Sequence, residues 1–154
     1  MKRTFKYRAY PTPTQERWLY AEFKHQKRLY NYMLQMRSQM YLYGGISVSK
    51  VDQINHLAIL RKGNTYYSDH PQDMQVSTIK RLDHAYDHFF RRCKDPTEKK
   101  KGHPKFKGSA RSVSWCLRKH KLKTGERVRQ NPIRETGKRH NLLKVPKLGE
   151  VKIR

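Results

Sequence analysis

The sequence predicts an α+β protein in which a small β-barrel-like domain carries an inserted bundle of three helices. Three observations predict this class. Alternating residues open the chain over residues 1–10, apolar residues recur at helical spacing across residues 11–98, and short apolar runs between turn signals fill residues 99–154. We therefore expect one domain from the first and last of these segments, with the helical domain between them.

The composition indicates a polyanionic partner. The 154 residues include 36 Lys and Arg against 12 Asp and Glu, which gives a formal net charge of +24. Self-repulsion of this size destabilises a free compact chain, and a polyanion relieves it. Ten Tyr, five Phe and two Trp accompany the charge. Cations interleaved with aromatic rings are typical of proteins that bind RNA or single strands.

A membrane surface and disorder are two alternative causes of such a charge, and the sequence disfavours both. A membrane is the rival polyanion, but the sequence contains no long apolar run, signal peptide or lipidation motif. The helical periodicity of the first ~95 residues argues against disorder there. Cys93 and Cys116 have no metal-ligand or disulfide spacing, so we expect free thiols in a reducing compartment such as the cytoplasm.

The opening strand is expected to be half-buried, because its odd positions bring Phe5, Tyr7 and Ala9 to one face. The run Thr12–Gln15 then predicts a helix start. It offers an N-cap threonine, a proline at the first helical position and a glutamine at the capping-box position. The pair Gly44-Gly45 predicts the end of this helix.

Two further helices follow. Ser49 with Asp52 predicts a second capping box, and Gly63 the end of the second helix. We expect a loop over Asn64–Pro71 and a third helix from about Gln72 to Cys93. Its apolar face at helical spacing consists of Leu82, Ala85, Tyr86, Phe89 and Phe90.

A basic extended segment comes after the third helix. Three lysines at 99–101 precede Gly102–Gly108, in which Phe106 stands between Lys105 and Lys107. Successive side chains of an extended chain point to opposite sides. We therefore expect Phe106 to face the core and both lysines to face solvent, where they can bind a phosphate backbone.

The last third of the chain predicts short strands. Residues 112–117 alternate as a strand does, and turn signals follow at Thr124-Gly125, Asn131-Pro132 and Thr136-Gly137. Two strands with a break at Pro146 are expected at the end. Because the sequence stops inside the last one, we expect either a truncated chain or a partner that completes the sheet.

Several segments, in order and spacing, resemble the N-terminal half of TnpB, the transposon-encoded RNA-guided DNA nuclease family related to type V CRISPR effectors. The matching segments are Tyr10–Gln15, Arg28–Asn31, Leu82 with Ala85, Phe89 and Phe90, His103–Lys107, Val145–Gly149 and Val151–Ile153.

The resemblance implies that residues 1–10 and 99–154 form a wedge domain and residues 11–98 a recognition domain. Together these would hold a guide RNA and read a short motif beside the double-stranded DNA target, while base pairing reads the rest. The family's RuvC acids and zinc element would lie beyond Arg154. No cofactor is therefore expected in this chain, and magnesium and zinc are expected only in that missing part. Residues 119–140 are longer and more basic than the family's usual linker. The resemblance also implies a cytoplasmic protein encoded by a prokaryote, a phage or a mobile element.

Fourteen residues are candidates for nucleic-acid contact, chosen for charge, polarity or an aromatic ring near the motifs above. Arg28 and Asn31 could equally serve helix packing, Trp115 could equally be core, and Gln75 lies one position out of register with a target-reading residue of the family. The candidates are Lys6, Arg8, Arg28, Asn31, Lys50, Gln53, Gln72, Gln75, Lys80, Lys105, Lys107, Trp115, Lys147 and Lys152.

No catalytic constellation is recognisable. His84 and His88 lie one helical turn apart beside Asp83 and Asp87, but a solvated helix face explains this spacing better than a metal, because no third ligand is evident. We expect no catalytic and no metal-binding residues. The expected function is to hold guide RNA and position target DNA. One rival is a subunit of a split RNA-guided nuclease with RuvC on another chain, and the other is a helix-turn-helix transposon regulator. The expected partners besides nucleic acid are a separate RuvC chain or a second copy.

Overall fold

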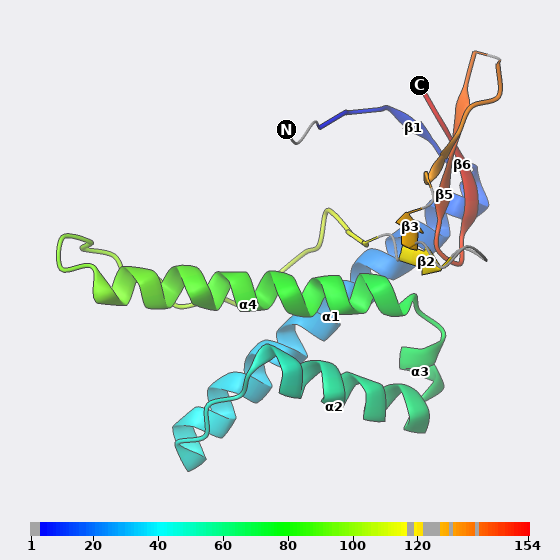
Figure 1. Ribbon diagram of the computed structural model, residues 1–154. Helices are drawn as coiled ribbons and strands as arrows, with labels where there is room; N and C mark the ends of the chain where they lie inside the picture. Colours follow the sequence, from blue (N-terminus) through cyan, green and yellow to red (C-terminus); the bar gives the residue numbers. More distant parts are fainter. Residues whose placement is uncertain (1–3, 117–118, 122–126, 130, 138) are drawn as a thin grey trace. The chain divides into compact units, whose positions relative to one another are not determined.

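The computed structural model is a mixture of helices and antiparallel strands, in agreement with the predicted α+β class (Figure 1). It describes residues 4–116, 119–121, 127–129, 131–137 and 139–154. The chain divides into two compact units, one from residues 1–21 with 117–154 and the other from residues 22–116. The assignment of these parts to a wedge and a recognition domain stays a prediction.

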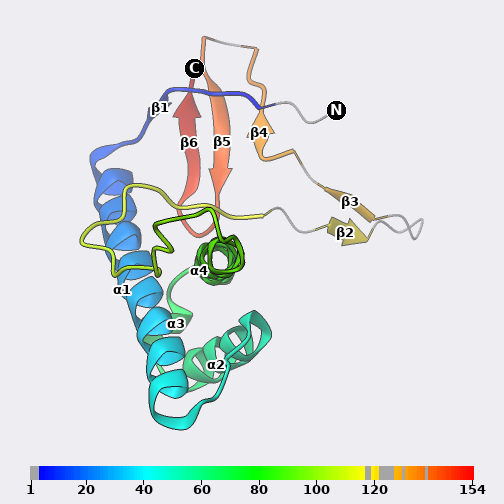
Figure 2. The same cartoon turned by 90° about the vertical axis from the view of Figure 1, so that its left-hand side faces the viewer.

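The first unit contains a four-stranded antiparallel sheet, in the order β1-β6-β5-β4 (Figure 2). Its central hairpin confirms the two strands expected around Pro146, and the chain turns over residues 146–148. Among the described strands the sheet is open, because β1 and β4 are its two edges. A separate two-stranded sheet joins β2 to β3. The strands are β1 (Ala9–Tyr10), β2 (Lys119–Lys121), β3 (Arg127–Arg129), β4 (Ile133–Arg134), β5 (Asn141–Val145) and β6 (Gly149–Ile153).

The opening strand is much shorter than predicted. Arg8 and Arg154 exchange two main-chain hydrogen bonds of 2.9 Å, and β1 continues this pairing with β6 for two residues. Phe5 and Tyr7 are 69% and 47% exposed. The expectation that they lie on a buried face was wrong, because the alternation of side chains buries residues only where a strand has neighbours to pack against.

The three predicted helices begin and end within about one residue of the expected positions, and capping bonds explain where α1 and α2 begin. The N–H of Thr12 donates to Oε1 of Gln15 (3.0 Å), and the N–H of Gln15 donates to Oγ1 of Thr12 (3.3 Å). Ser49 and Asp52 make the same reciprocal pair. These bonds satisfy N–H groups that the first helical turn leaves without a partner. The helices are α1 (Pro13–Gly44), α2 (Lys50–Gly63), α3 (Thr65–Ser68) and α4 (Gln72–Lys94).

The core of the second unit is built by α1, α2 and α4. The two long helices cross in Figure 1, and Figure 2 looks along α4, which lies beside α1. The short α3 lies within the stretch that was expected to be a loop. Phe90 is 54% exposed, so the expectation that it belongs to the core was wrong. The buried cluster comprises Leu29, Tyr30, Met33, Leu34, Leu57, Ile79, Leu82 and Tyr86.

Two apolar residues of α2, one buried and one exposed, provide a test of this core. Leu57 is 1% exposed and Ile59 is 68% exposed. We predict that Leu57→Ala lowers the free energy of unfolding by about 2–5 kcal/mol, because it removes buried methyl groups and leaves a cavity. Ile59→Ala should change it by less than about 0.5 kcal/mol. Urea titrations followed by circular dichroism measure both, and equal effects would contradict this arrangement of the core.

Candidate nucleic-acid interface

The basic segment after α4 is bound along the helical unit, and we call residues 99–116 the strap. At its start, the guanidinium of Arg92 donates to the carbonyls of Lys101 (2.7 Å) and Gly102 (2.9 Å). The ammonium of Lys101 in turn donates to the carbonyl of Arg92 (2.9 Å). These cations hold main-chain oxygen atoms and fix the path of the strap.

The later part of the strap is not the strand that its alternation predicted. Residues 112–116 have no strand structure, and the predicted end of that strand at Leu117 lies outside the described residues. Arg81 of α4 donates to Oγ of Ser114 (2.8 Å) and to the carbonyl of Ser112 (3.4 Å). The segment is held by a helix side chain, which explains why its alternation does not lead to strand pairing.

Asn31 clamps the middle of the strap. Its Nδ2 donates to the carbonyl of Lys107 (3.0 Å), and its Oδ1 accepts from the N–H of Lys107 (2.8 Å). The ammonium of Lys107 lies 4.0 Å from the centre of the Tyr30 ring. Burial, and then the charge of Arg81, lower the pKa of Lys107. Asn31 therefore has a packing role here, one of the two alternatives that the sequence left open.

Phe106 is 62% exposed, and the expectation that it faces the core was wrong. Lys105 is exposed and Lys107 is half-buried against Tyr30, so only one of the two lysines faces solvent as expected. The clamp at Asn31 gives the reason, since it turns the side chain of Lys107 toward the helices.

Four further candidates lie on the surface of the helical unit or close to it. Lys80 and Gln72 are exposed on α4. Arg28 is exposed on α1, and its Nη1 donates to the hydroxyl of Tyr66 at 3.5 Å. Trp115 is half-buried in the strap, which leaves both of its alternatives open.

The remaining glutamine candidates lie inside the helical unit. Gln53 and Gln75 are both 0% exposed. Nε2 of Gln53 donates to the carbonyl of Met33 (2.7 Å). Oε1 of Gln75 accepts from Arg61, and its Nε2 donates to the carbonyl of Tyr67 (3.0 Å). A nucleic acid could reach either amide only after these side chains moved, and their binding roles stay predictions.

Gln75 belongs to a buried polar cluster that sequence reasoning missed. The rings of His25 and His70 stack with centroids 3.6 Å apart, and Nδ1 of His70 lies 2.6 Å from Oε2 of Glu22. Nε2 of His25 lies 2.8 Å from Nε2 of Gln75. Burial, followed by the charges of His70, Arg61 and Arg28, lowers the pKa of His25 to about 3. His25 is therefore neutral in the folded protein near pH 7.

Lys50 takes part in a bridge between helices. Its ammonium contacts Oδ2 of Asp83 (2.9 Å), and Nη2 of Arg37 contacts Oδ1 of the same carboxylate (3.0 Å). Partial burial opposes ionisation of Asp83, but the hydrogen bonds from Lys50 and Arg37 outweigh it and hold the pKa of this carboxyl below its usual value. Asp83 was expected on a solvated helix face, but its side chain is only 17% exposed and binds two cations.

The first unit presents its own exposed candidates. Lys6, Arg8, Lys147 and Lys152 are all exposed. The guanidinium of Arg8 lies 5.5 Å from the centre of the Tyr10 ring. Lys147 has a positive φ of 62° in the turn between β5 and β6. Lys152 points away from the buried face of β6, where Val151 and Ile153 are 2% exposed.

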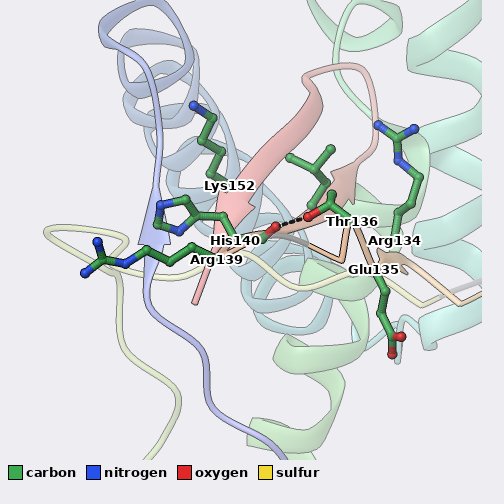
Figure 3. A pocket seen from close by; sticks show the side chains of 7 residues that line it. Arg134, Glu135, Thr136, Arg139, His140 and Lys152 are labelled. Carbon is green, nitrogen blue, oxygen red and sulfur yellow. Dashed lines mark hydrogen bonds between the residues drawn. The ribbon is translucent and has the colours of Figure 1, made fainter.

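Lys152 borders a basic hollow of about 680 Å³ in the first unit (Figure 3). In Figure 3 Lys152, Arg139 and His140 lie on one side, with Arg134 and Glu135 on the other. The hydroxyl of Thr136 donates to the carbonyl of His140 and ties the turn together. The hollow is lined by Arg134, Glu135, Thr136, Arg139, His140, Leu142 and Lys152.

The guanidinium of Arg134 is paired with Glu150 (2.6 Å), so the positive charge available in the hollow comes from Arg139 and Lys152 and still exceeds that of Glu135. This excess suits a phosphate group. Sequence reasoning missed Arg134, Arg139 and His140, although the basic residues around the Thr136-Gly137 turn signal could have indicated them.

No group of three or more His, Cys, Asp or Glu side chains in the described part of the chain is arranged to hold a metal ion. The expectation that this chain holds no cofactor stays a prediction. His84 and Asp87 have side chains 78% and 68% exposed. Within the described ranges, no helix combines the length and apolar composition that a membrane span requires.

Residues 1–45 match the helix-turn-helix domain family named for OrfB of the insertion sequence IS605. No curated protein matches the chain at a significant level. The matched residues hold β1 and the single uninterrupted helix α1. A helix-turn-helix motif needs two helices joined by a short turn. The second helix would have to be α2, which begins at Lys50, beyond the matched residues.

The buried histidine gives a pH prediction. His25 has a depressed pKa in the folded protein, so below about pH 6.5 the unfolded chain binds a proton that the folded chain does not. Stability should therefore be complete above this pH and fall as the pH decreases. We expect this group to contribute a loss of about 1–2 kcal/mol between pH 7.5 and 5.

His25→Gln should reduce the pH dependence of the free energy of unfolding, measured by urea titration at each pH. The matched control is His84→Gln, which alters a histidine exposed on α4. The same slope in parent and His25→Gln would contradict the assignment.

Proposed function

We propose that this chain is the non-catalytic, RNA-holding part of a TnpB-like RNA-guided DNA-targeting system. It holds a structured guide RNA and helps to recognise the DNA motif beside the target. The observation that carries the proposal is the match of residues 1–45 to the helix-turn-helix domain family of IS605 OrfB. The net charge of +24 supports a nucleic acid as the partner.

The proposal divides the chain into a barrel-like wedge domain, from residues 1–10 and 99–154, and a three-helix recognition domain from residues 11–98. Pairing of β1 with β6 supports the first assignment, because it brings the two distant ends of the sequence into one sheet. The buried cluster shared by α1, α2 and α4 supports the second.

Exposed cations in both units would make the phosphate contacts. In the first unit these are Lys6, Arg8, Lys147 and Lys152, and in the second Arg28, Lys80 and Lys105. Each is a charge that a phosphate can reach without a change in the packing of the core. A separate RuvC chain would supply the nuclease and hold the magnesium and zinc, and a second copy of this chain is the other partner proposed. The system would act in the cytoplasm of a prokaryotic cell.

A second candidate function is a helix-turn-helix regulator that binds duplex DNA. The description of the matching family favours it, and α1 and α2 could form the pair, since only residues 45–49 separate them. Its binding would be specific for a duplex and independent of RNA.

Salt dependence tests the proposed function. Because each neutralised phosphate releases counterions, the log–log plot of RNA affinity against salt should have a slope of magnitude above about 3. The double variant Arg139→Gln with Lys152→Gln removes two charges that line the hollow. It should lower that magnitude by about 1.5.

Fluorescence anisotropy with a structured RNA at several salt concentrations measures these slopes. Lys62→Gln is the matched control, since this exposed lysine of α2 is not assigned to the interface. A parent slope below about 3 would overturn the polyanion-binding function. If the double variant has the same salt slope as the parent, the hollow is not part of the RNA interface.

A competition experiment separates the two candidate functions. We expect the purified chain to retain a structured RNA in the presence of a roughly tenfold molar excess of any duplex of about 30 bp at physiological salt, because a guide-RNA holder binds RNA in preference to duplex. A regulator would instead release RNA to one particular duplex and bind it specifically without RNA. Sequencing of the duplexes retained from a random pool, with and without the co-purified RNA, decides between them.

A further inference from the structure

The strap presents a phenylalanine to solvent and a lysine to the helices, which reverses the arrangement that hydrophobic burial favours. Phe106 is 62% exposed. Its neighbour Lys107 is half-buried, with its ammonium 4.0 Å from the centre of the Tyr30 ring. Positions at which a chain departs from such local rules are often functional sites, because selection for another property outweighs the cost.

This arrangement is fixed by hydrogen bonds to the main chain of the strap on the residues after Phe106. Both hydrogen bonds of Asn31 go to the N–H and the carbonyl of Lys107. The ammonium of Lys27 donates to the carbonyl of Gly108 (3.2 Å) one residue later. A shift of the strap by one residue would turn Phe106 inward, and these bonds oppose it. The ring is therefore held outward by contacts on its own neighbours.

The surroundings of the ring indicate what it contacts. Lys105 is exposed beside it, and lysines 99 and 100 are exposed earlier in the strap. An apolar protein partner would have to leave these charges next to its own surface. A nucleic acid instead offers a flat base for the ring and phosphates for the lysines, the combination that single-strand binding proteins use.

We propose that Phe106 is a stacking platform for an unpaired base of a bound nucleic acid, with Lys105 contacting a phosphate next to that base. The shared chemistry is a nucleobase exposed in a single-stranded segment, of RNA or of DNA. This inference rests on the proposed function, which requires a nucleic acid but does not say where a base is contacted.

Three variants of the full chain test the platform. Phe106→Ala should weaken binding of a fluorescent single strand of about 12 nucleotides by about 5- to 150-fold, which corresponds to the stacking of one base. Phe106→Tyr keeps a ring and should bind within about threefold of the parent. Lys105→Gln should lower the magnitude of the salt slope by about 0.7, whereas Phe106→Ala should leave it unchanged, because only the lysine neutralises a phosphate.

Tyr41→Ala is the matched control, since Tyr41 is an aromatic residue of the same unit and is 69% exposed. It should bind like the parent. RNA and DNA strands of one sequence are compared. Weaker binding of both strands by Phe106→Ala supports a platform that accepts either nucleic acid, and weaker binding of only one strand supports a platform for that nucleic acid.

If the parent binds the single strand and Phe106→Ala binds it with the same affinity, the platform is overturned and the proposed function stands. A thermal midpoint several degrees lower in Phe106→Ala would show a packed ring and would also overturn the platform. A parent that binds no nucleic acid would overturn the proposed function itself.

Discussion

This protein has thirty-six Lys and Arg side chains but only twelve Asp and Glu side chains, so ion pairs cannot satisfy most of its cations. The helical unit satisfies several of them with main-chain carbonyl groups instead. Arg37 donates to the carbonyl of Val48 (2.7 Å), and Arg61 donates to that of Tyr67 (2.6 Å) and to that of His70 (2.9 Å). Such charge-assisted bonds satisfy oxygen atoms that irregular segments leave without partners. The path of the loops and of the strap depends on these bonds.

The use of cations as internal donors changes how the net charge is interpreted. A guanidinium that holds two carbonyls, as Arg92 does, is not free to hold a phosphate without releasing the strap. Lys50, bound to Asp83, is restricted in the same way. A count of basic residues therefore overestimates the phosphate contacts. The surplus of positive charge nevertheless remains and still favours a polyanionic partner.

The parts of the fold that could be predicted from sequence are those decided by residues close together in the chain. The capping pairs Thr12 with Gln15 and Ser49 with Asp52 are each three residues apart, so their bonds are visible in the sequence. The orientation of Phe106 could not be predicted, because it depends on the clamp of Asn31 on Lys107, two residues that are 76 positions apart. The burial of Gln53 and Gln75 was equally difficult to predict. A glutamine amide can contact a nucleic acid, or it can form hydrogen bonds with a buried carbonyl or guanidinium, as it does here. Composition does not distinguish these two uses.

The match to residues 1–45 also has a structural limit. These residues do not complete any layer of the fold by themselves, since Ala9 in β1 pairs with Ile153 of β6. The buried face of α1 includes Leu29 and Met33, which pack in a cluster with Ile79 of α4. Because both contacts cross the limit of the matched segment, its sheet and its core exist only with the rest of the chain. Any binding property of that segment must therefore be measured on the whole chain.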